Sequence, residues 1–204
     1  MVIRNLRSSD DLGRAAEILF LADPYIMEAL FGNKETAGKV GRALFSSAAD
    51  DLFSFDRVLV AEEDGEIQGI LCFRNGCCNW DQKILGKVFQ DINLAVPTGF
   101  NRVNEVYLNK LSCDELPPNS SECMFLAVSE DCRGKGIGSA LLKHWMDTSN
   151  QRNFYLDVLA DNHRAIAIYQ KHGFVVTEQH KGFSRDETAR PECYRMVKER
   201  SLNN

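Results

Sequence analysis

The sequence lacks the long apolar run that a membrane-spanning helix requires. None of its apolar stretches reaches about 18 consecutive residues. The start of the chain also lacks the pattern of a secretory signal, because Met1-Val2-Ile3-Arg4 begins directly as a strand-like segment. We therefore expect a soluble, cytoplasmic protein without a membrane partner.

Positive charge is not in excess either. The chain of 204 residues carries a formal net charge of -5 at pH 7. Proteins that bind nucleic acids usually present basic patches and gain affinity by releasing counterions from phosphates. The charge balance argues against a nucleic-acid partner and weakly favours a cationic or amine substrate.

Metal-ligand spacing is missing as well. The seven cysteines are an odd number, and none of them forms the paired Cys-x-x-Cys spacing of a zinc site. The four histidines have no ligand spacing relative to these cysteines. We expect free thiols in a reducing compartment and no metal.

What remains is the composition of an ordinary globular domain. Hydrophobic residues make up 44% of the chain and charged residues 26%, which suffices for one well-filled core. No internal repeat or low-complexity tract interrupts it. We expect a single domain over residues 1–204.

The most informative stretch runs from Glu122 to Trp145 and has the pattern of a strand, a glycine-rich turn and a helix. Met124 to Val128 is a short apolar run with a β-branched end. From Ile137 onward, apolar residues recur with helical spacing. The hydrophobic period therefore changes from two to about 3.6 across the glycines.

The turn between these two elements predicts an anion site. Its sequence is Arg133-Gly134-Lys135-Gly136-Ile137-Gly138-Ser139. Glycines permit positive φ and let a ligand approach the backbone, and the unpaired amides and dipole of a helix N-terminus favour negative charge. The strict alternation of the glycines matches neither a P-loop nor the dinucleotide fingerprint. We expect a phosphate or pyrophosphate ligand, and the alternative is a tight turn that only caps the helix.

Two motifs in this order and spacing resemble the GNAT superfamily of N-acetyltransferases. The first comprises Leu126-Ala127-Val128 and the run from Arg133 to Leu142, and it is similar to the coenzyme A signature. The second comprises Asn162, Ala165, Tyr169 and Gly173-Phe174. The resemblance implies an α/β fold with a mixed, twisted sheet of six to seven strands flanked by helices.

The resemblance also implies acetyl-CoA as cosubstrate and an amine as acceptor. Pantetheine would lie beside Leu126, Ala127 and Val128, bonded to the main chain like an added strand. Pyrophosphate would bind the loop residues Arg133, Gly134, Lys135, Gly136, Ile137, Gly138 and Ser139. Asn162 and Tyr169 would contact coenzyme A from the following helix.

Periodicity and turn signals place the remaining elements along the chain. The predicted strands are 2–5, 57–62, 66–74, 153–159, 174–178 and 193–198, and the predicted helices start at Leu12, Glu35 and Asn162. A long connection, about 75–121, lies between the third and fourth strands and has helical spacing from Trp80 to Phe89 and from Phe100 to Leu111. This helical insertion would be either a wall of the acceptor site or additional core or a dimer surface, so a homodimer stays open.

Two residues are candidates for proton transfer. Tyr169 follows Asn162 by two helical turns on nearly the same face, so it would face the sulfur and protonate the leaving thiolate. Glu122 opens the central strand at the position of the catalytic glutamate in histone-type members of the family, which implies a general base; Asp157, Glu105 and a water chain are alternatives. Alternation would place Glu122, Met124 and Leu126 on one face and Cys123, Phe125 and Ala127 on the other, unless a bulge intervenes.

Three functions compete at this stage. The leading hypothesis is direct acetyl transfer to a small-molecule amine or to a peptide or protein amine. A non-catalytic coenzyme A binding or sensor module would keep the phosphate loop without turnover. An interaction protein that uses the insertion is the third.

Overall fold

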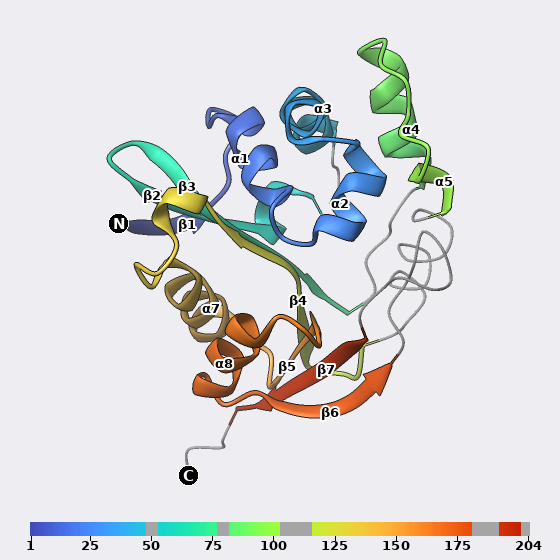
Figure 1. Ribbon diagram of the computed structural model, residues 1–204. Helices are drawn as coiled ribbons and strands as arrows, with labels where there is room; N and C mark the ends of the chain where they lie inside the picture. The colour runs from blue at the N-terminus through green and yellow to red at the C-terminus, as the bar shows by residue number, and fades with distance from the viewer. Residues whose placement is uncertain (48–52, 77–81, 103–115, 181–191, 201–204) are drawn as a thin grey trace.

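The computed structural model describes residues 1–47, 53–76, 82–102, 116–180 and 192–200 (Figure 1). Within these ranges, the chain forms one seven-stranded sheet in the order β1-β2-β3-β4-β5-β7-β6. The pair of β4 and β5 is parallel, and the other neighbouring strands are antiparallel. The predicted mixed sheet with flanking helices is therefore confirmed.

The element bounds follow the predicted ones closely, except that no helix was predicted over Pro24–Phe31. The strands are β1 (Val2–Asn5), β2 (Val58–Glu63), β3 (Glu66–Asn75), β4 (Ser120–Val128), β5 (Asn153–Leu159), β6 (Val175–His180) and β7 (Cys193–Glu199). The α-helices are α1 (Leu12–Leu19), α2 (Pro24–Phe31), α3 (Lys34–Ser47), α4 (Gln82–Asp91), α5 (Phe100–Arg102), α7 (Ile137–Thr148) and α8 (His163–Lys171). Short 3-10 helices are η1 (Phe55–Arg57) and η3 (Glu130–Cys132).

Capping residues explain where the first helices begin. The Asp11 side chain accepts a hydrogen bond from the Arg14 amide at 3.0 Å and starts α1. Asp23 accepts from the amides of Tyr25 and Ile26, and Pro24 occupies the first turn of α2. The Asp23-Pro24 pair therefore separates α1 from α2 and also begins α2.

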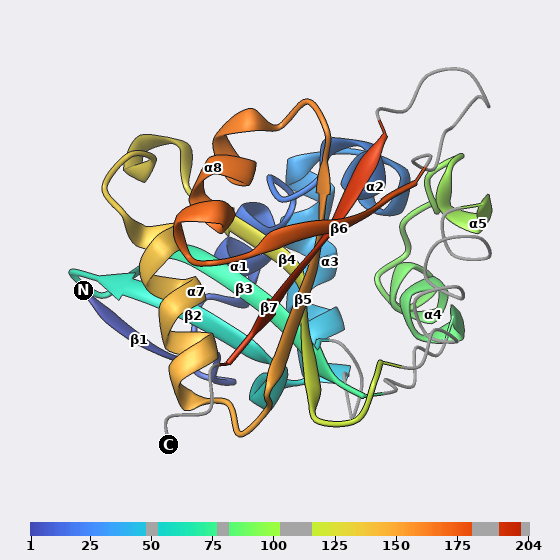
Figure 2. The same ribbon diagram turned by 90° about the horizontal axis from the view of Figure 1, so that it is seen from below.

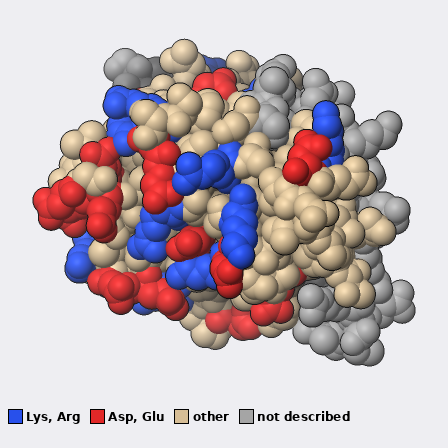
Figure 3. All heavy atoms as spheres, turned by 90° about the horizontal axis from the view of Figure 1, so that it is seen from above, with Lys and Arg blue, Asp and Glu red and all other residues tan. Residues whose placement is uncertain are grey.

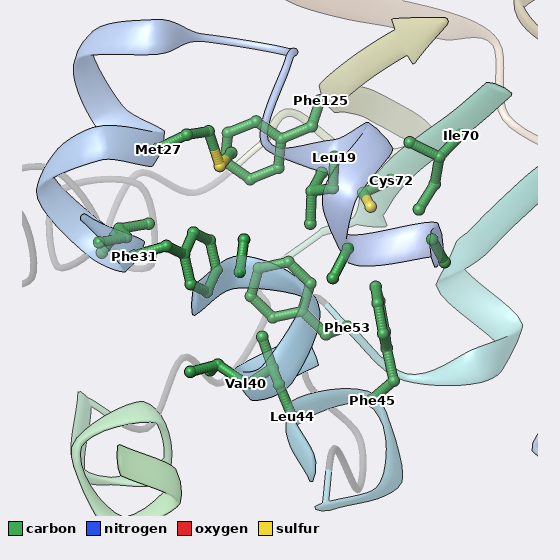
Figure 4. Packing of buried hydrophobic residues seen from close by; sticks show 14 of the residues in the cluster. Leu19, Met27, Phe31, Val40, Leu44, Phe45, Phe53, Ile70, Cys72 and Phe125 are labelled. Atoms are coloured by element: carbon green, nitrogen blue, oxygen red, sulfur yellow. The ribbon is translucent and has the colours of Figure 1, made fainter. Parts of the chain in front are cut away.

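The helices form two layers, one on each face of the sheet (Figures 1 and 2). Helices α1, α2 and α3 lie on one face, and α7 and α8 lie on the other. The first face carries the larger core, in which Phe53 stacks on Phe125 with ring centroids 6.5 Å apart (Figure 4). The second core packs α7 and α8 against the sheet through Trp145, which meets Phe154 edge to face.

A bulge in β4 corrects the predicted alternation. Cys72 of β3 pairs with Phe125, and the next residue of β3 pairs with Cys123, so Met124 is an extra residue in β4. Met124 and Phe125 therefore both face the core under α1 to α3, whereas Cys123 and Leu126 both face the core under α7 and α8. The prediction that Met124 and Leu126 share a face is wrong because the bulge shifts the pleat by one residue.

The insertion between β3 and β4 carries helices, as predicted. Helix α4 covers most of the first predicted segment, and α5 covers the start of the second. The rest of the second segment, including the alternative base Glu105, lies outside the described residues. Gly32, at the end of α2, lies near Pro97 of the insertion, which the chain thus brings back to the helical layer.

Charges of both signs are mixed on the face in Figure 3. Lys39 Nζ lies 2.6 Å from Glu35 Oε1, and Arg14 Nη1 lies 3.7 Å from Glu17 Oε2. In the part of the chain that the structure describes, no helix is both long and apolar enough to cross a membrane. The four described cysteines, Cys72, Cys123, Cys132 and Cys193, are buried, and none of these four is in a disulfide bond.

Candidate active site

The two central strands, β4 and β5, run side by side over only part of their length. Their parallel pairing extends from Ser120 opposite Asn153 to Cys123 opposite Leu156. Beyond this point β4 continues to Val128 with β3 as its partner, and β5 continues with β7 as its partner. Among the described residues, no main-chain ladder joins the two strand ends. This strand opening leaves one edge of β4 for an extended ligand.

The predicted pantetheine residues lie on that edge of β4. The side chains of Leu126 and Val128 pack against the core under α7 and α8, and Ala127 packs into the opposite core. Their side chains are thus committed to the two cores. Only their main-chain groups are suited to bond a ligand in the strand opening, which is what an added strand requires.

The glycine-rich loop follows β4 and leads into α7. Gly134 and Gly136 have positive φ values of 86° and 83°, which residues with side chains rarely adopt. Gly136 is the N-cap of α7 and provides no side-chain acceptor to the helix amides. A Cβ added to Gly136 would meet no described atom within 4 Å. Open space at a helix N-terminus suits a pyrophosphate.

Two residues of α7 contribute differently from the loop. Gly138 is not among the positive-φ glycines, and a Cβ added to it would make an ordinary contact 3.6 Å from Val128 Cγ2, so neither the backbone nor the packing requires glycine at this position. The Ile137 side chain is 3% exposed and belongs to the core. A Cβ on Gly69 of β3 would lie 2.9 Å from Ile137 Cγ2, which shows how tightly the start of α7 is held on the sheet.

Basic side chains surround the loop. The Arg133 side chain is 45% exposed and lies near Glu130, and the Lys135 ammonium lies 3.7 Å from the Cys132 sulfur. The Arg164 Nη2 atom of α8 lies 3.7 Å from the position that a Cβ on Gly134 would occupy. Arg164 was not among the predicted ligands, although its place two residues after Asn162 brings it to this end of α8.

Asn162 and Tyr169 occupy the two ends of α8. The Asn162 side chain caps the helix by accepting from the Ala165 amide at 3.1 Å. The Tyr169 ring is buried, with 8% of the residue exposed, and meets Phe174 edge to face at 6.1 Å. Within the described ranges, its hydroxyl has no hydrogen-bond partner. Tyr169 belongs to the same core cluster as Cys123, the last residue of β4 that pairs with β5.

Burial controls the ionisation of Tyr169 and Cys123. It raises the pKa of Tyr169 well above its usual value, with a smaller contribution from the nearby Cys123 thiol. It also raises the pKa of Cys123, and the Glu122 carboxylate adds to that shift. The phenol and the thiol are thus both held in their protonated forms at neutral pH.

Glu122 lies in a charged network on the opposite face. Its Oε2 accepts from Arg74 Nε at 2.6 Å, and its Oε1 accepts from Arg195 Nη2 at 2.7 Å. Arg195 also donates to both carboxylate oxygens of Asp157, at 2.8 and 2.9 Å. The network therefore joins four strands, β3, β4, β5 and β7, beside the strand opening.

Burial and the two arginines act on Glu122 in opposite directions. The side chain is only 3% exposed, and loss of water raises the pKa of Glu122, while Arg74 and Arg195 oppose the rise. For Arg195, burial favours the neutral form, but the hydrogen bonds and charges of Asp157 and Glu122 outweigh it and raise its pKa. Arg195 is thus a firmly cationic partner of a buried carboxylate.

Comparison with known proteins identifies the family and the fold. The model of the acetyltransferase (GNAT) family matches residues 33–174. The chain belongs to this GNAT family. The match includes the strand opening, the glycine-rich loop and Tyr169, and it makes the protein an acyl-CoA-dependent acetyltransferase. The fit of acetyl-CoA to the site rests on the open space at Gly136 and the unpaired edge of β4.

Individual relatives agree with the family. A 5-NmdU N-acetyltransferase of Pseudomonas phage PaMx11 is 26% identical over 157 residues, which cover 77% of this chain and 83% of the phage protein. A solved acetyltransferase structure has a TM-score of 0.64 at 24% identity and covers 98% of this chain and 99% of its own. The ribosomal-protein-S18-alanine N-acetyltransferase from Escherichia coli has a TM-score of 0.58 at 16% identity and covers 100% and 96%. The two structures show the fold alone.

Two arginines beside the strand opening were not singled out from the sequence. Arg74 and Arg195 are 121 positions apart in the chain, at positions 74 and 195, and no local pattern connects them. Arg74 gives little local signal either, because it follows the apolar run Ile70 to Phe73 and stands directly before Asn75 at the end of β3, where a charged side chain usually faces water. Asp157, named only as an alternative base, proves to be the second carboxylate of the network.

Proposed function

We propose that the protein transfers the acetyl group of acetyl-CoA to a primary amine by direct attack within a ternary complex. The proposal rests on Tyr169. Its ring is buried beside the point where β4 and β5 separate, and its hydroxyl has no hydrogen-bond partner among the described residues. Such a donor is preorganised for a group that arrives only with the substrate.

Tyr169 acts as general acid in this proposal. When bound, acetyl-CoA supplies a thioester whose C–S bond breaks as the bond between the amine nitrogen and the acetyl carbon forms. The raised pKa of Tyr169 keeps the phenol protonated until a thiolate develops beside it. The phenol proton then passes to the leaving sulfur, the attacking nitrogen gives up its second proton to solvent as the amide forms, and solvent returns a proton to the phenolate.

Glu122 takes the proton that the ammonium group must lose before attack. Both of its oxygens already accept from an arginine, and its side chain is 3% exposed, so the proton reaches it through a water molecule instead of by direct contact with the amine. The two proton transfers occur on opposite faces of β4, because Cys123 and Tyr169 lie on the face that Glu122 does not share.

The acceptor is a primary amine on a small molecule, a peptide or a protein. The phage relative is named for 5-NmdU, and the Escherichia coli protein with the same fold is named for the alanine of a ribosomal protein. An acceptor panel with 5-NmdU, polyamines, amino acids and alanine-terminated peptides, read by release of free thiol from acetyl-CoA, covers these classes. Acetyl-CoA binding without thiol release from any amine would favour the sensor module instead.

Tyr169→Phe tests the carrying observation. The ring and its packing on Phe174 remain, so we expect the unfolding temperature and the acetyl-CoA KM to change little. Turnover should fall about 100- to 10,000-fold, the usual contribution of a general acid. Steady-state kinetics with the best amine of the panel measures this, and a loss of no more than about twofold would assign Tyr169 to packing.

A further inference from the structure

Arg195 bonds a residue that lies beyond the strand with which its own backbone pairs. Its backbone lies on β7 opposite Asp157 of β5, while its Nη2 reaches past β5 to Glu122 of β4. Nε and Nη2 grip both oxygens of Asp157 at 2.8 and 2.9 Å. One guanidinium thus bonds two carboxylates on two different strands.

The place of these bonds coincides with the end of the parallel ladder. Glu122 lies within the paired part of β4, one residue before its last pair at Cys123. Asp157 is the first residue of β5 beyond the ladder, directly after Leu156. The Arg195 side chain therefore connects Glu122, near the end of the ladder, with Asp157, the first residue of β5 that does not pair with β4, at the apex of the strand opening.

We infer that Arg195 is a positioning residue: it ties Glu122 to Asp157 at the apex of the strand opening and holds the Glu122 carboxylate ionised and oriented for the proton of the acceptor amine. This inference rests on the proposed function, in which Glu122 receives that proton. It assigns to Arg195 no contact with acetyl-CoA or with the amine.

The charges around Glu122 determine the direction of the effect. Arg74 of β3, Arg195 of β7 and Asp157 of β5 act on it directly. Cys123 on its own strand is protonated, Tyr155 of β5 lies opposite Glu122 in the parallel ladder, and Glu178 of β6 acts on Arg195. Without Arg195, Arg74 would still lower the pKa of Glu122 and the Asp157 charge would still raise it, in a site with little water. Protonation of Glu122 would then become easier, and its pKa would rise.

Three substitutions of Arg195 remove its charge and its hydrogen-bond geometry to different extents. Arg195→Met keeps much of the side-chain volume and removes the charge. Arg195→Gln keeps a polar donor, so it serves if the methionine variant does not fold. Arg195→Lys keeps the charge but replaces the planar fork by a single point, which cannot bond two carboxylates with the same geometry.

The chain offers a matched control elsewhere. Arg4 of β1 also joins an aspartate and a glutamate: it donates to both oxygens of Asp10, at 2.7 and 2.9 Å, and bonds Glu62 of β2. Its side chain is 15% exposed, close to the 18% of Arg195. Arg4→Met therefore removes a comparable ion-pair centre that does not touch Glu122.

The decisive measurement is the titration of the Glu122 side-chain carboxyl by carbon NMR, with its signal assigned by its loss in Glu122→Gln. We expect the midpoint to rise by about 1 to 3 pH units in Arg195→Met or Arg195→Gln, the range that one close opposite charge accounts for. Arg195→Lys should give a smaller rise, and Arg4→Met none. An unchanged midpoint in a folded Arg195→Met or Arg195→Gln protein would overturn the inference.

Kinetics separates this inference from the proposed function. The acid limb of the kcat/KM profile should move to higher pH in the same order as the NMR midpoints, because activity requires ionised Glu122. If no amine gives turnover with the unaltered enzyme, the proposed function fails, while the carboxyl titration still decides the role of Arg195. If turnover occurs and the limb stays in place although the midpoint moves, Arg195 does not act through Glu122.

Discussion

The two sides of the strand opening are built from different materials. On the coenzyme side, the groups suited to bind are main-chain groups: the free edge of β4, the positive-φ glycines of the loop and the N-terminus of α7. On the acceptor side, they are charged side chains that join four strands around Glu122. In the proposed mechanism, the first side would hold acetyl-CoA through backbone geometry, whereas the second would adjust the ionisation of a single carboxylate, Glu122.

The two sides also differ in the substitutions that they tolerate. A backbone site accepts changes of most side chains but not the filling of its space, so its critical positions are glycines. A buried charge network accepts almost no removal of one member, because the remaining charges lose compensation in a site with little water. Substitutions that test the comparison should therefore fail for different reasons on the two sides.

The largest effect is expected at Gly136. In Gly136→Val the new side chain would enter the open space in front of α7, and acetyl-CoA should bind at least about 100-fold more weakly, equivalent to about 2.8 kcal/mol. Isothermal titration calorimetry with acetyl-CoA measures this. Unchanged affinity would remove the pyrophosphate from this loop.

A second glycine provides the control for Gly136. Gly65, in the turn between β2 and β3, has φ of 82° and also meets no described atom within 4 Å of an added Cβ. Valine at either position is strained by about 1 to 3 kcal/mol. Gly65→Val should thus lose similar stability but bind acetyl-CoA normally, and equal weakening by both variants would point to strain instead of occupied space.

An intermediate effect is expected at Glu122, on the acceptor side. Glu122→Gln keeps the shape but cannot take a proton, so turnover near neutral pH should fall about 100- to 10,000-fold. Because the amine loses its proton unaided at high pH, part of the activity should return there. Rate profiles of both proteins against pH check this, with the folded fraction followed by circular dichroism, since Arg74 and Arg195 lose their full partner. A rate ratio that stays constant with pH would make Glu122 purely structural.

The strand, loop and helix of the coenzyme side could be predicted from the sequence because they are adjacent in the chain. That their residues bind acetyl-CoA stays a prediction. The run from Leu126 to Ser139 contains strand, loop and helix start, and its change of period and its glycines are local signals. The exceptions are instructive. Gly138 has an ordinary backbone conformation and room for a Cβ beside Val128, and the Ile137 side chain lies in the core. Both were grouped with the loop residues because they stand in the same alternating run, although the helical spacing already begins at Ile137.

The acceptor side could be predicted only in part. Glu122 was identified through the family resemblance, but its partners Arg74 and Arg195 lie on strands that only the sheet order brings together. The bulge at Met124 has no turn residue or glycine to mark it, so simple alternation assigned the wrong faces beyond it. Long-range register, which decides both features, is not encoded in any short stretch.

The smallest effect is expected at Cys123, the residue between the two sides. A cysteine could take the acetyl group from the thioester, since one thioester would replace another, and pass it to the amine. Cys123 lies on the coenzyme face with Tyr169, where such an exchange would need it. Attack requires the thiolate, however, and burial with the nearby Glu122 charge raises the pKa of Cys123, so the thiol stays protonated.

Cys123→Ala should therefore keep activity within about twofold, far from the loss expected of a nucleophile or an acid. Its modest cost should appear as reduced stability, because Cys123 is 5% exposed and its sulfur fills space beside the core of α7 and α8. The sharper measurement uses the unaltered enzyme: incubation with acetyl-CoA and no acceptor, followed by intact mass and peptide mapping. Direct transfer predicts no acetyl group on Cys123. A stoichiometric acetyl-Cys123 that disappears when an amine is added, with acetylated amine formed in equal amount, would replace direct attack by a two-step route and would place the nucleophile on the coenzyme side.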